Sequence, residues 1–341
     1  MENSMNIYDI ARLAGVSIAT VSRVVNGSEK VSEKTRKKVL SIIEQEGFTP
    51  NVFAQGLGLH TMHIVGILVP DISDLYMSVA VSCLEKQLKA HGYDCILSCS
   101  GFTQEQKESH VQMLLSKHID ALILVGSTYS GHGSRKETAF IRAAAAQVPV
   151  FLINALVDGD GIYCSVSRDR EAIRSVTAAL IANRHRRILF LTDSKSYSAS
   201  EKKKGYEEAL QAAELPILSA LEWNVPNDID EVCSRLLANF PNIDSIVATH
   251  DLLAVGALKY AAAKGIAVPG ELAIVGFNDS LLARCTEPAL SSIDNQIEQL
   301  CLNTVDHLIA VLGGRQDVPH SFSVECRLAE RRTTDFGISC V

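Results

Sequence analysis

One stretch near the N-terminus, NIYDIARLAGVSIATVSRVVN at residues 6–26, constrains this 341-residue chain more than any other. Asn6 and Ser17 are residue types that cap helix N-termini, and Gly15 permits a tight turn that a Cβ atom would obstruct. Apolar residues recur at helical spacing on both sides of this glycine: Ile7, Ile10, Ala11, Ala14, Val21, Val24 and Val25. The pattern predicts two short helices joined by a turn, either as a DNA-binding helix-turn-helix or as an ordinary helical hairpin.

A third helix and a linker are predicted next. Ser32 is a suitable N-cap, Glu33 lies in the first turn, and Gly47 ends the helix. Its buried face is predicted to consist of Val39, Leu40, Ile42 and Ile43. The linker carries the sequence PNVFAQGL at residues 50–57.

Together these residues resemble the DNA-binding head of the lactose-repressor (LacI/GalR) family of bacterial transcription regulators. The matches occur in one order and register: Tyr8–Ala11, Ala14–Ser17, Thr20–Asn26, Val31, Ser32, Thr35, Arg36, Val39, Gly47, Phe48, Pro50, Asn51, Ala54 and Leu57. The resemblance implies a helix-turn-helix DNA-binding domain at 1–49, a hinge helix or linker at 50–61, and an effector-binding core at 62–341.

The resemblance also implies which residues meet DNA. Base reading falls to Ile18, Ala19, Ser22 and Arg23, and phosphate contacts to Ser17, Thr20 and Asn26. This division fits the side chains, because an arginine can donate two hydrogen bonds to guanine while isoleucine and alanine can only pack, for example on thymine methyl groups. The hinge residues Asn51, Ala54 and Leu57 complete the set.

Leu57 is expected to act as a wedge. In the family, a hinge leucine pairs with its twin and enters the central base step in the minor groove. Gly56 and Gly58 flank it here, and each glycine costs a helix about 1 kcal/mol relative to alanine. The hinge is therefore expected to fold only on DNA. The alternative to the wedge role is that Leu57 is an ordinary residue of a linker.

Composition excludes several classes of protein. The chain is 47% hydrophobic and 21% charged, which argues against disorder, and its net charge of −7 does not by itself suggest nucleic acid. No apolar run reaches the roughly 18–20 residues of a membrane span, and the polar start carries no secretory signal. The nine cysteines are scattered without a CxxC pair. We therefore expect a cytoplasmic protein with reduced thiols, no bound metal and no cofactor.

From residue 63 onward, short apolar runs alternate with helical stretches. The predicted strands are 64–69, 95–98, 121–125, 150–153, 188–191, 246–248 and 273–275, with a weaker one near 220–222. The predicted helices are 76–90, 104–118, 137–147, 169–183, 200–213, 229–239, 251–264 and 297–312. This βα alternation predicts two doubly wound parallel sheets with a cleft between them.

The two-lobed pattern resembles the periplasmic-binding-protein-like core of the same family. The fold expected is thus an all-α head plus an α/β core of two doubly wound subdomains. Lobe 1 is placed at about 62–163 and 294–320, lobe 2 at about 164–293, and a C-terminal strand region at 321–341. Chain crossings between lobes are predicted near 163–166, near 291–295 and after Pro319.

An enzymatic function is not expected. No GxGxxG follows the first strand, and no GxSxG frames a nucleophile. Residues 126–132, GSTYSGH, have the glycine spacing of a phosphate-binding loop but carry His132 where a lysine must meet the phosphates. A polar loop is the better interpretation.

For the cleft, the resemblance implies the effector-binding positions Ser73, Tyr76, Asn154, Lys202, Trp223, His250, Asn278 and Asn295. Relatives that bind free sugars commonly carry aspartates where this chain has Asn154 and Asn278. Lys202 stays cationic, with Lys203 and Lys204 beside it, which favours an anionic effector such as a sugar acid or sugar phosphate. The alternative is a neutral sugar, with the lysines on a solvated helix face.

By resemblance, a homodimer binds a palindromic double-stranded operator, and a small effector in the cleft controls it. This predicts a regulator, most simply a repressor, of carbohydrate metabolism genes. The alternative is a core that responds to a partner protein, as in the catabolite-control branch.

Overall fold

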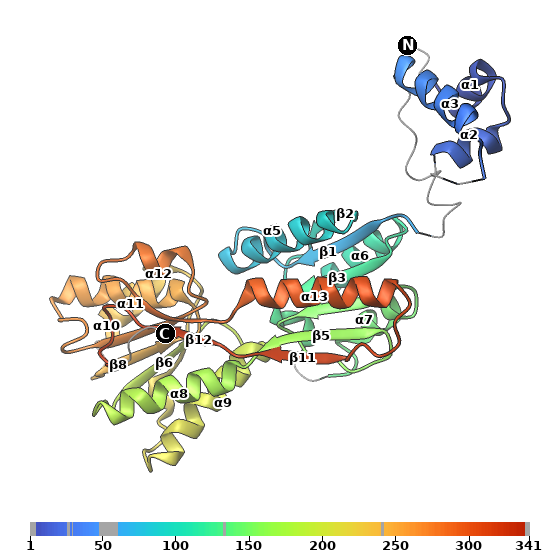
Figure 1. Cartoon of the computed structure of the whole chain (residues 1–341). Helices are drawn as coiled ribbons and strands as arrows, with labels where there is room; N and C mark the ends of the chain where they lie inside the picture. The colour runs from blue at the N-terminus through green and yellow to red at the C-terminus, as the bar shows by residue number, and fades with distance from the viewer. Residues whose placement is uncertain are drawn as a thin grey trace. The chain divides into compact units, whose positions relative to one another are not determined.

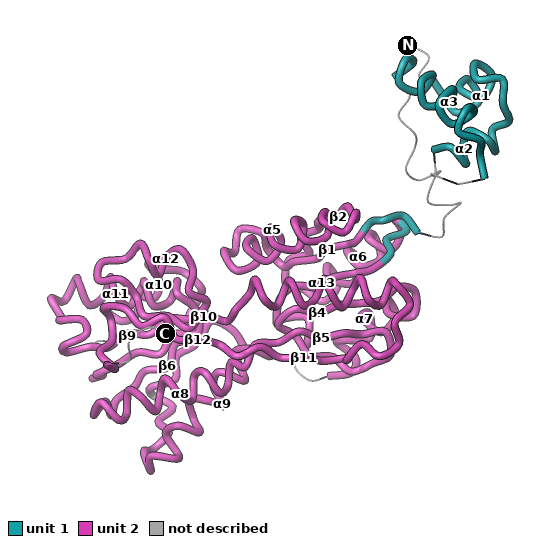
Figure 2. The backbone as a smooth tube through the Cα atoms, in the orientation of Figure 1, with its two compact units in different colours: residues 1–64, 118–120 teal, residues 65–117, 121–341 magenta. Residues whose placement is uncertain are grey.

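The computed structural model describes residues 5–25, 28, 30–47, 61–131, 134–239 and 242–337. Contacts divide the chain into two compact units, which Figure 2 colours separately. One unit contains the N-terminal head, and the other contains nearly all of the α/β core.

The head consists of three helices, α1 (Ile7–Ala14), α2 (Ile18–Val25) and α3 (Glu33–Gln45). Its core contains one residue or more from each helix, namely Ile10, Ala11, Ala14, Val21, Val24 and Val39. This confirms the predicted helical spacing in the first two helices. One prediction is wrong: Leu40 is 46% exposed, because it follows Val39 by a single residue and so points about 100° away from the buried side.

Lobe 1 of the core is built on a six-stranded sheet in the order β11-β5-β4-β3-β1-β2. Neighbouring strands run parallel from β11 through β5, β4 and β3 to β1. The elements of lobe 1 are β1 (Ile64–Val69), α5 (Leu75–Ala90), β2 (Asp94–Cys99), α6 (Gln104–Leu115), β3 (Ala121–Val125), the 3₁₀ helix η1 (Ser127–Ser130), α7 (Ala139–Ala145), β4 (Val150–Ile153), β5 (Ile162–Ser167), α13 (Ile297–Leu312) and β11 (Ser321–Val324).

Lobe 2 has a second six-stranded sheet in the order β12-β10-β9-β8-β6-β7, parallel except that β12 runs antiparallel to β10. Its elements are α8 (Asp169–Ala182), β6 (Ile188–Thr192), α9 (Tyr197–Ala212), the 3₁₀ helix η2 (Ser219–Leu221), β7 (Glu222–Asn224), α10 (Ile229–Asn239), β8 (Ser245–Ala248), α11 (Asp251–Lys264), β9 (Ala273–Phe277), α12 (Leu281–Cys285), β10 (Ser291–Asp294) and β12 (Arg327–Ala329).

Helices cover both faces of each sheet, as Figure 1 shows. In lobe 1, α5 and α13 pack on one face of the sheet. In lobe 2, α8 and α9 cover one face, and α10 and α11 cover the other. The predicted architecture of a helical head and two doubly wound lobes is therefore confirmed.

Two stretches predicted as crossings are strands instead. Residues 163–166 lie inside β5, which pairs with β4, and residues 291–294 form β10, which pairs with β9. The chain leaves each sheet directly after these strands, and it crosses a third time between β11 and β12. Both strands mix serine with apolar residues, so neither presents the continuous apolar run expected of a central strand.

A carboxylate directly before β8 holds the start of this strand by hydrogen bonds to neighbouring backbone. Asp244 accepts hydrogen bonds from the backbone N–H groups of Arg186 and Arg187, at 2.9 and 3.0 Å, and lies 3.5 Å from the His185 imidazole. Burial raises the pKa of Asp244, but these neighbours outweigh it and lower the pKa to about 2. The arrangement fixes β8 beside β6, with which it pairs.

Asp244→Asn is expected to lower the free energy of unfolding at neutral pH by up to about 2 kcal/mol. Because the folded pKa of about 2 lies below the ordinary aspartate value of 3.8, this stability is present above pH 3.8 and is lost as the pH falls toward 2. Urea unfolding of both proteins at pH 7 and at pH 3 measures it. A stability difference that is the same at both pH values would contradict this assignment.

Candidate nucleic-acid interface and interlobe cavity

The turn between α1 and α2 is built from local capping interactions. The Asn6 side chain accepts hydrogen bonds from the N–H groups of Tyr8 and Asp9, and the Asp9 carboxylate accepts one from the Asn6 N–H. Gly15 ends α1 with φ 66°, the left-handed conformation predicted for it. Ser17 Oγ then accepts from the Thr20 N–H at 3.2 Å and caps α2. The turn therefore fixes the direction in which α2 leaves it.

The outer face of α2 carries the predicted base-reading positions. Ile18 is 42% exposed, and Ala19 and Arg23 are also exposed. Val21 and Val24 are buried on the opposite side of the helix, which leaves Ser22 half-buried at the boundary. An apolar side chain exposed at the start of a helix, with a cation one turn and a half later, is suited to packing on base edges and donating to guanine.

Four predicted DNA-binding residues lie outside the described residues: Asn26, Asn51, Ala54 and Leu57. The chain that follows them is anchored at the start of β1. Asp120 accepts hydrogen bonds from the N–H groups of Met62 and Ile64, at 3.0 and 2.9 Å. Sequence analysis missed Asp120, because its partners lie more than fifty residues away.

A cavity of about 840 Å³ lies between the lobes. Lobe 1 contributes the loop after β1 and the start of α5, and lobe 2 contributes the starts of α11 and α12 and the loop after β9. Four predicted effector positions line the cavity: Ser73, Tyr76, His250 and Asn278. Ligand sites in open α/β sheets lie at the carboxyl ends of the strands, where these residues are found.

Hydrogen bonds connect two of these residues with neighbours behind them. Asn295 Nδ2 donates to Asn278 Oδ1 at 2.9 Å, and Asn278 Nδ2 lies 3.1 Å from His250 Nδ1. On its other side, His250 Nε2 lies 3.4 Å from Asp193 Oδ1. Burial raises the pKa of Asp193, but His250 and Lys202 outweigh that effect and lower it. Sequence analysis missed Asp193, because its partner His250 is distant along the chain.

Lys202 does not present its charge to the cavity as predicted. Its side chain is buried, and its Nζ donates to the Thr249 carbonyl at 3.0 Å and lies 3.6 Å from the centre of the Phe277 ring. Burial lowers the pKa of Lys202, against the opposing effect of nearby carboxylates. The neighbouring lysines are paired outward, Lys203 with Glu222 and Lys204 with Glu201.

The remaining two predicted positions do not line the cavity. Asn154 ends β4 with φ 61° and donates its backbone N–H to the Ser165 carbonyl. Trp223 lies in β7, packed against the lobe 2 core with the Arg235 guanidinium 5.2 Å from its ring centre. The alignment of Trp223 with a cleft position therefore has no support in the cavity lining.

Charge and hydrogen-bonding capacity define what the cavity suits. Its lining includes the carboxylates of Asp71, Asp74, Asp251, Asp279, Asp294 and Glu298, of which Asp279 is paired with Arg331 at 2.6 Å, together with the side chains of Arg284 and His250. Within the part of the chain that the structure describes, Tyr76 Oη, Asn154 Oδ1 and Asn295 Oδ1 are buried without a hydrogen-bond partner, and of these three residues only Tyr76 lines the cavity. A ligand rich in hydroxyl groups can satisfy the Tyr76 hydroxyl, and a lining with more carboxylates than cations favours a neutral ligand over an anion.

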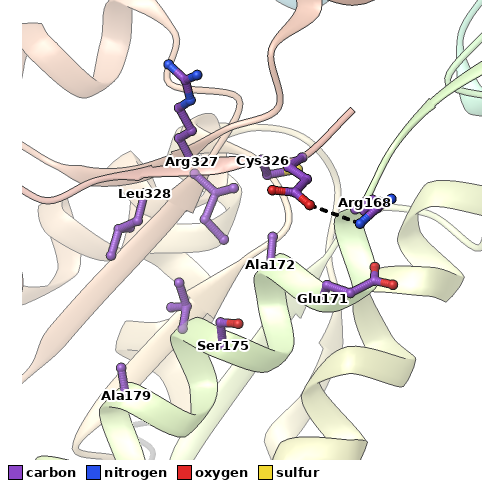
Figure 3. Close-up of a pocket in the computed structure, with 11 residues that line it drawn as sticks. Arg168, Glu171, Ala172, Ser175, Ala179, Cys326, Arg327 and Leu328 are labelled. Carbon is purple, nitrogen blue, oxygen red and sulfur yellow. Dashed lines mark hydrogen bonds and ion pairs between the residues drawn. The ribbon is translucent and has the colours of Figure 1, made fainter. Parts of the chain in front are cut away.

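A second cavity, of about 340 Å³, lies on lobe 2 between α8 and β12 (Figure 3). Its wall includes Ala172, Ala179 and Leu328, and the ion pair between Arg168 and Glu325 lies at its edge. None of the predicted effector positions lines it, so the interlobe cavity is the candidate effector site.

Comparison with known proteins agrees with this geometry. Residues 6–51 match the model of bacterial regulatory proteins of the lacI family, and residues 177–334 match a periplasmic binding protein-like domain. An HTH-type transcriptional regulator from Lachnoclostridium phytofermentans is 43% identical over 335 residues, which are 97% of this chain and all of the relative.

Two solved structures have the same fold. A Lac repressor dimer bound to operator and the anti-inducer ONPF superposes with a TM-score of 0.86 at 24% identity, covering 97% of this chain and 99% of that one. A complex of the transcriptional regulator CelR with cellobiose superposes with a TM-score of 0.71 at 25% identity, covering 97% and 100%.

These relatives are regulators of transcription, and the chain is not an enzyme. The segment 126–131, which has the glycine spacing of a phosphate-binding loop, contains η1, with Tyr129 buried and hydrogen-bonded to Ser100. Among the helices that the structure describes, none combines the length and apolar composition needed to cross a membrane.

Proposed function

Since this chain belongs to the LacI family of bacterial regulatory proteins, we propose that it is a repressor of carbohydrate genes that a neutral sugar controls. It is a DNA-binding transcriptional regulator. The further proposal is that two copies bind a palindromic operator through α2 and the hinge residues 50–61. The observation that supports a sugar as the effector is the interlobe cavity, whose lining combines several carboxylates with the unpartnered hydroxyl of Tyr76.

The proposed mechanism couples the cavity to the hinge. A sugar that contacts both lobes changes their relative angle, because it binds one arrangement more tightly than the other. The hinge segments of the two copies then move, and this decides whether Leu57 can enter the minor groove. Asp120 supports this coupling, because it ties Met62, just after the hinge, and Ile64, the first residue of β1, to the start of β3.

We expect the outer face of α2 to contact bases through Ile18, Ala19, Ser22 and Arg23. Phosphate contacts are expected from Ser17 and Thr20. Arg23→Ala is expected to weaken binding to the preferred operator by about 1–3 kcal/mol, because a bidentate contact to guanine is lost. Binding to scrambled DNA is expected to change much less. Fluorescence titration measures both, using an operator selected from random duplexes with the wild-type protein.

Arg12→Ala is the matched control for Arg23. Arg12 lies in α1, is 78% exposed and pairs with Asp9 on the same helix. Removing it changes the charge of the head by the same amount as Arg23→Ala. Equal losses for the two variants, or an equal loss for Arg23→Ala on operator and scrambled DNA, would show that Arg23 does not read sequence.

For the effector, a thermal-shift screen of neutral mono- and disaccharides should identify a stabilising sugar, because a ligand that binds the folded state raises its melting temperature. The hit is then compared by calorimetry with its aldonic acid and its phosphate ester. We expect both anions to bind at least about tenfold more weakly, because they approach a lining with more carboxylates than cations. Tighter binding of an anion would restore the original anionic prediction.

Tyr76→Phe tests the site itself. It removes one buried unpartnered hydroxyl that lies at the cavity, and sugar binding is expected to weaken by about 0.5–1.5 kcal/mol.

If no sugar in the thermal-shift screen binds, a core that responds to a partner protein becomes the better hypothesis.

A further inference from the structure

Two cysteines face each other where α5 packs against α13. Cys83 Sγ lies 3.8 Å from the Glu298 carbonyl oxygen, and Cys301 Sγ lies 3.7 Å from the Ala80 carbonyl oxygen. Ala80 is one turn before Cys83, and Glu298 is one turn before Cys301. Each thiol therefore reaches the backbone of the other helix at the level of the other cysteine. Such reciprocal contacts require a close approach of the two helices.

The two thiols differ in access and in acidity. Cys83 is only partly buried, whereas Cys301 is fully buried in the lobe 1 core. The Cys301 thiol stabilises the Cys83 thiolate by hydrogen bonding and so lowers the pKa of Cys83. The same bond, together with burial, raises the pKa of Cys301. Cys83 is thus the accessible nucleophile, and Cys301 is a neutral thiol held behind it.

We propose that Cys83 and Cys301 form a dithiol–disulfide pair that hydroperoxides oxidise and thiol reductants restore. In the first step the Cys83 sulfur attacks the peroxide, a sulfur–oxygen bond forms, the oxygen–oxygen bond breaks, and an alcohol or water leaves. In the second step the Cys301 sulfur attacks Cys83, and the sulfenic oxygen leaves as water with the Cys301 proton. Two thiols lose two electrons, and one hydroperoxide gains them.

Because of its position, a disulfide between Cys83 and Cys301 would affect the wall of the interlobe cavity in the α/β core. α5 carries Leu75, Tyr76 and Val79 into the cavity lining, and α13 carries Ile297 and Leu302. Figure 1 shows the two helices on the same side of the lobe 1 sheet. A covalent bond between Cys83 and Cys301 would fix the two helices that form this wall. It would also close a long loop of chain, which stabilises the folded state.

The test uses the full-length, fully reduced protein and hydrogen peroxide. After oxidation the free thiols are blocked with N-ethylmaleimide, and the unreduced digest is analysed by mass spectrometry. We expect a linked pair of peptides containing Cys83 and Cys301, loss of two of the nine free thiols, and reversal by dithiothreitol. The melting temperature should rise by about 5 °C on oxidation, and this rise should be absent in Cys83→Ser and in Cys301→Ala.

Cys99→Ser is the control, because Cys99 is an exposed cysteine in β2 and should leave the linkage unchanged. The peptide analysis of the wild type decides the question even if replacing the buried Cys301 prevents folding. Oxidation of Cys83 to a sulfinic acid with Cys301 still free would overturn the proposal. A linkage of Cys83 to any other cysteine, within the chain or between chains, would overturn it as well.

Discussion

Replacing Ile10 with alanine is expected to unfold the N-terminal head and abolish operator binding. Ile10 is fully buried in α1, at the centre of a core of only six buried residues. Truncating a buried isoleucine to alanine costs about 2–5 kcal/mol. A domain of this size has a total stability of only a few kcal/mol, so the loss consumes most of it. α2 then loses the packing that holds it in place, so its outer face is no longer held in a fixed position.

The α/β core should be unaffected by this change, because Ile10 belongs to a hydrophobic cluster whose members all lie in the head. Calorimetry of the full-length variant should show the melting of the core within about 1 °C of the wild type. Operator binding is measured by anisotropy, and folding of the head by its resistance to limited proteolysis. Retained protease resistance with lost binding would mean that Ile10 acts on DNA by another route.

Leu40→Ala is the matched control for Ile10→Ala. It removes an aliphatic side chain of the same size from the same head, but Leu40 is nearly half exposed. Its cost should stay within about 0.5 kcal/mol, and operator binding should be retained. If Leu40→Ala lowered the free energy of unfolding as much as Ile10→Ala, Leu40 would have to make a contact outside the head.

Sequence patterns predicted the elements whose signals are local. The boundaries of β1, β3, β4, α10, α11 and α13 coincide with the predicted ranges. Each is a continuous apolar run or a stretch with helical apolar spacing. In α9 the helix begins at Tyr197, three residues earlier than predicted, because the Ser196 side chain accepts a hydrogen bond from the Ala199 N–H. That capping signal was present in the sequence but lies within a serine-rich segment with several candidates.

The candidate effector site was predicted less completely, and Lys202 explains why. Its residue type and its position by resemblance were both informative, but the direction of its side chain depends on Thr249 and Phe277, which are distant in sequence. Burial, opposed by nearby carboxylates, lowers its pKa. Likewise, the acidic character of the cavity arises from carboxylates on several separate loops. No local pattern in the sequence reports the combined charge of such a lining, so the prediction of an anionic ligand considered Lys202 and the two asparagines but not these carboxylates. It stays an alternative to the neutral sugar that the lining favours.

The second large effect is expected at the contact between α8 and α9, for the variant Gly205→Ala. A Cβ atom at Gly205 would lie 2.1 Å from the Arg170 carbonyl oxygen and 3.1 Å from the Arg174 backbone nitrogen. These are backbone atoms of α8, so the clash can be relieved only by moving one helix away from the other. Alanine is intrinsically better in a helix than glycine by about 1 kcal/mol, which offsets only part of this cost.

We expect a net loss of about 3 kcal/mol or more in the free energy of unfolding of the core, at or above the upper end of overpacking costs. The corresponding fall in melting temperature is about 6 °C or more for a core of this size. Because α9 also carries Lys202 behind the cavity, sugar binding should weaken with the displacement of the helix. Gly270→Ala is the control, since the nearest atom to its Cβ is 3.8 Å away, an ordinary contact. Equal melting temperatures for the two variants would show that α8 and α9 can separate without cost.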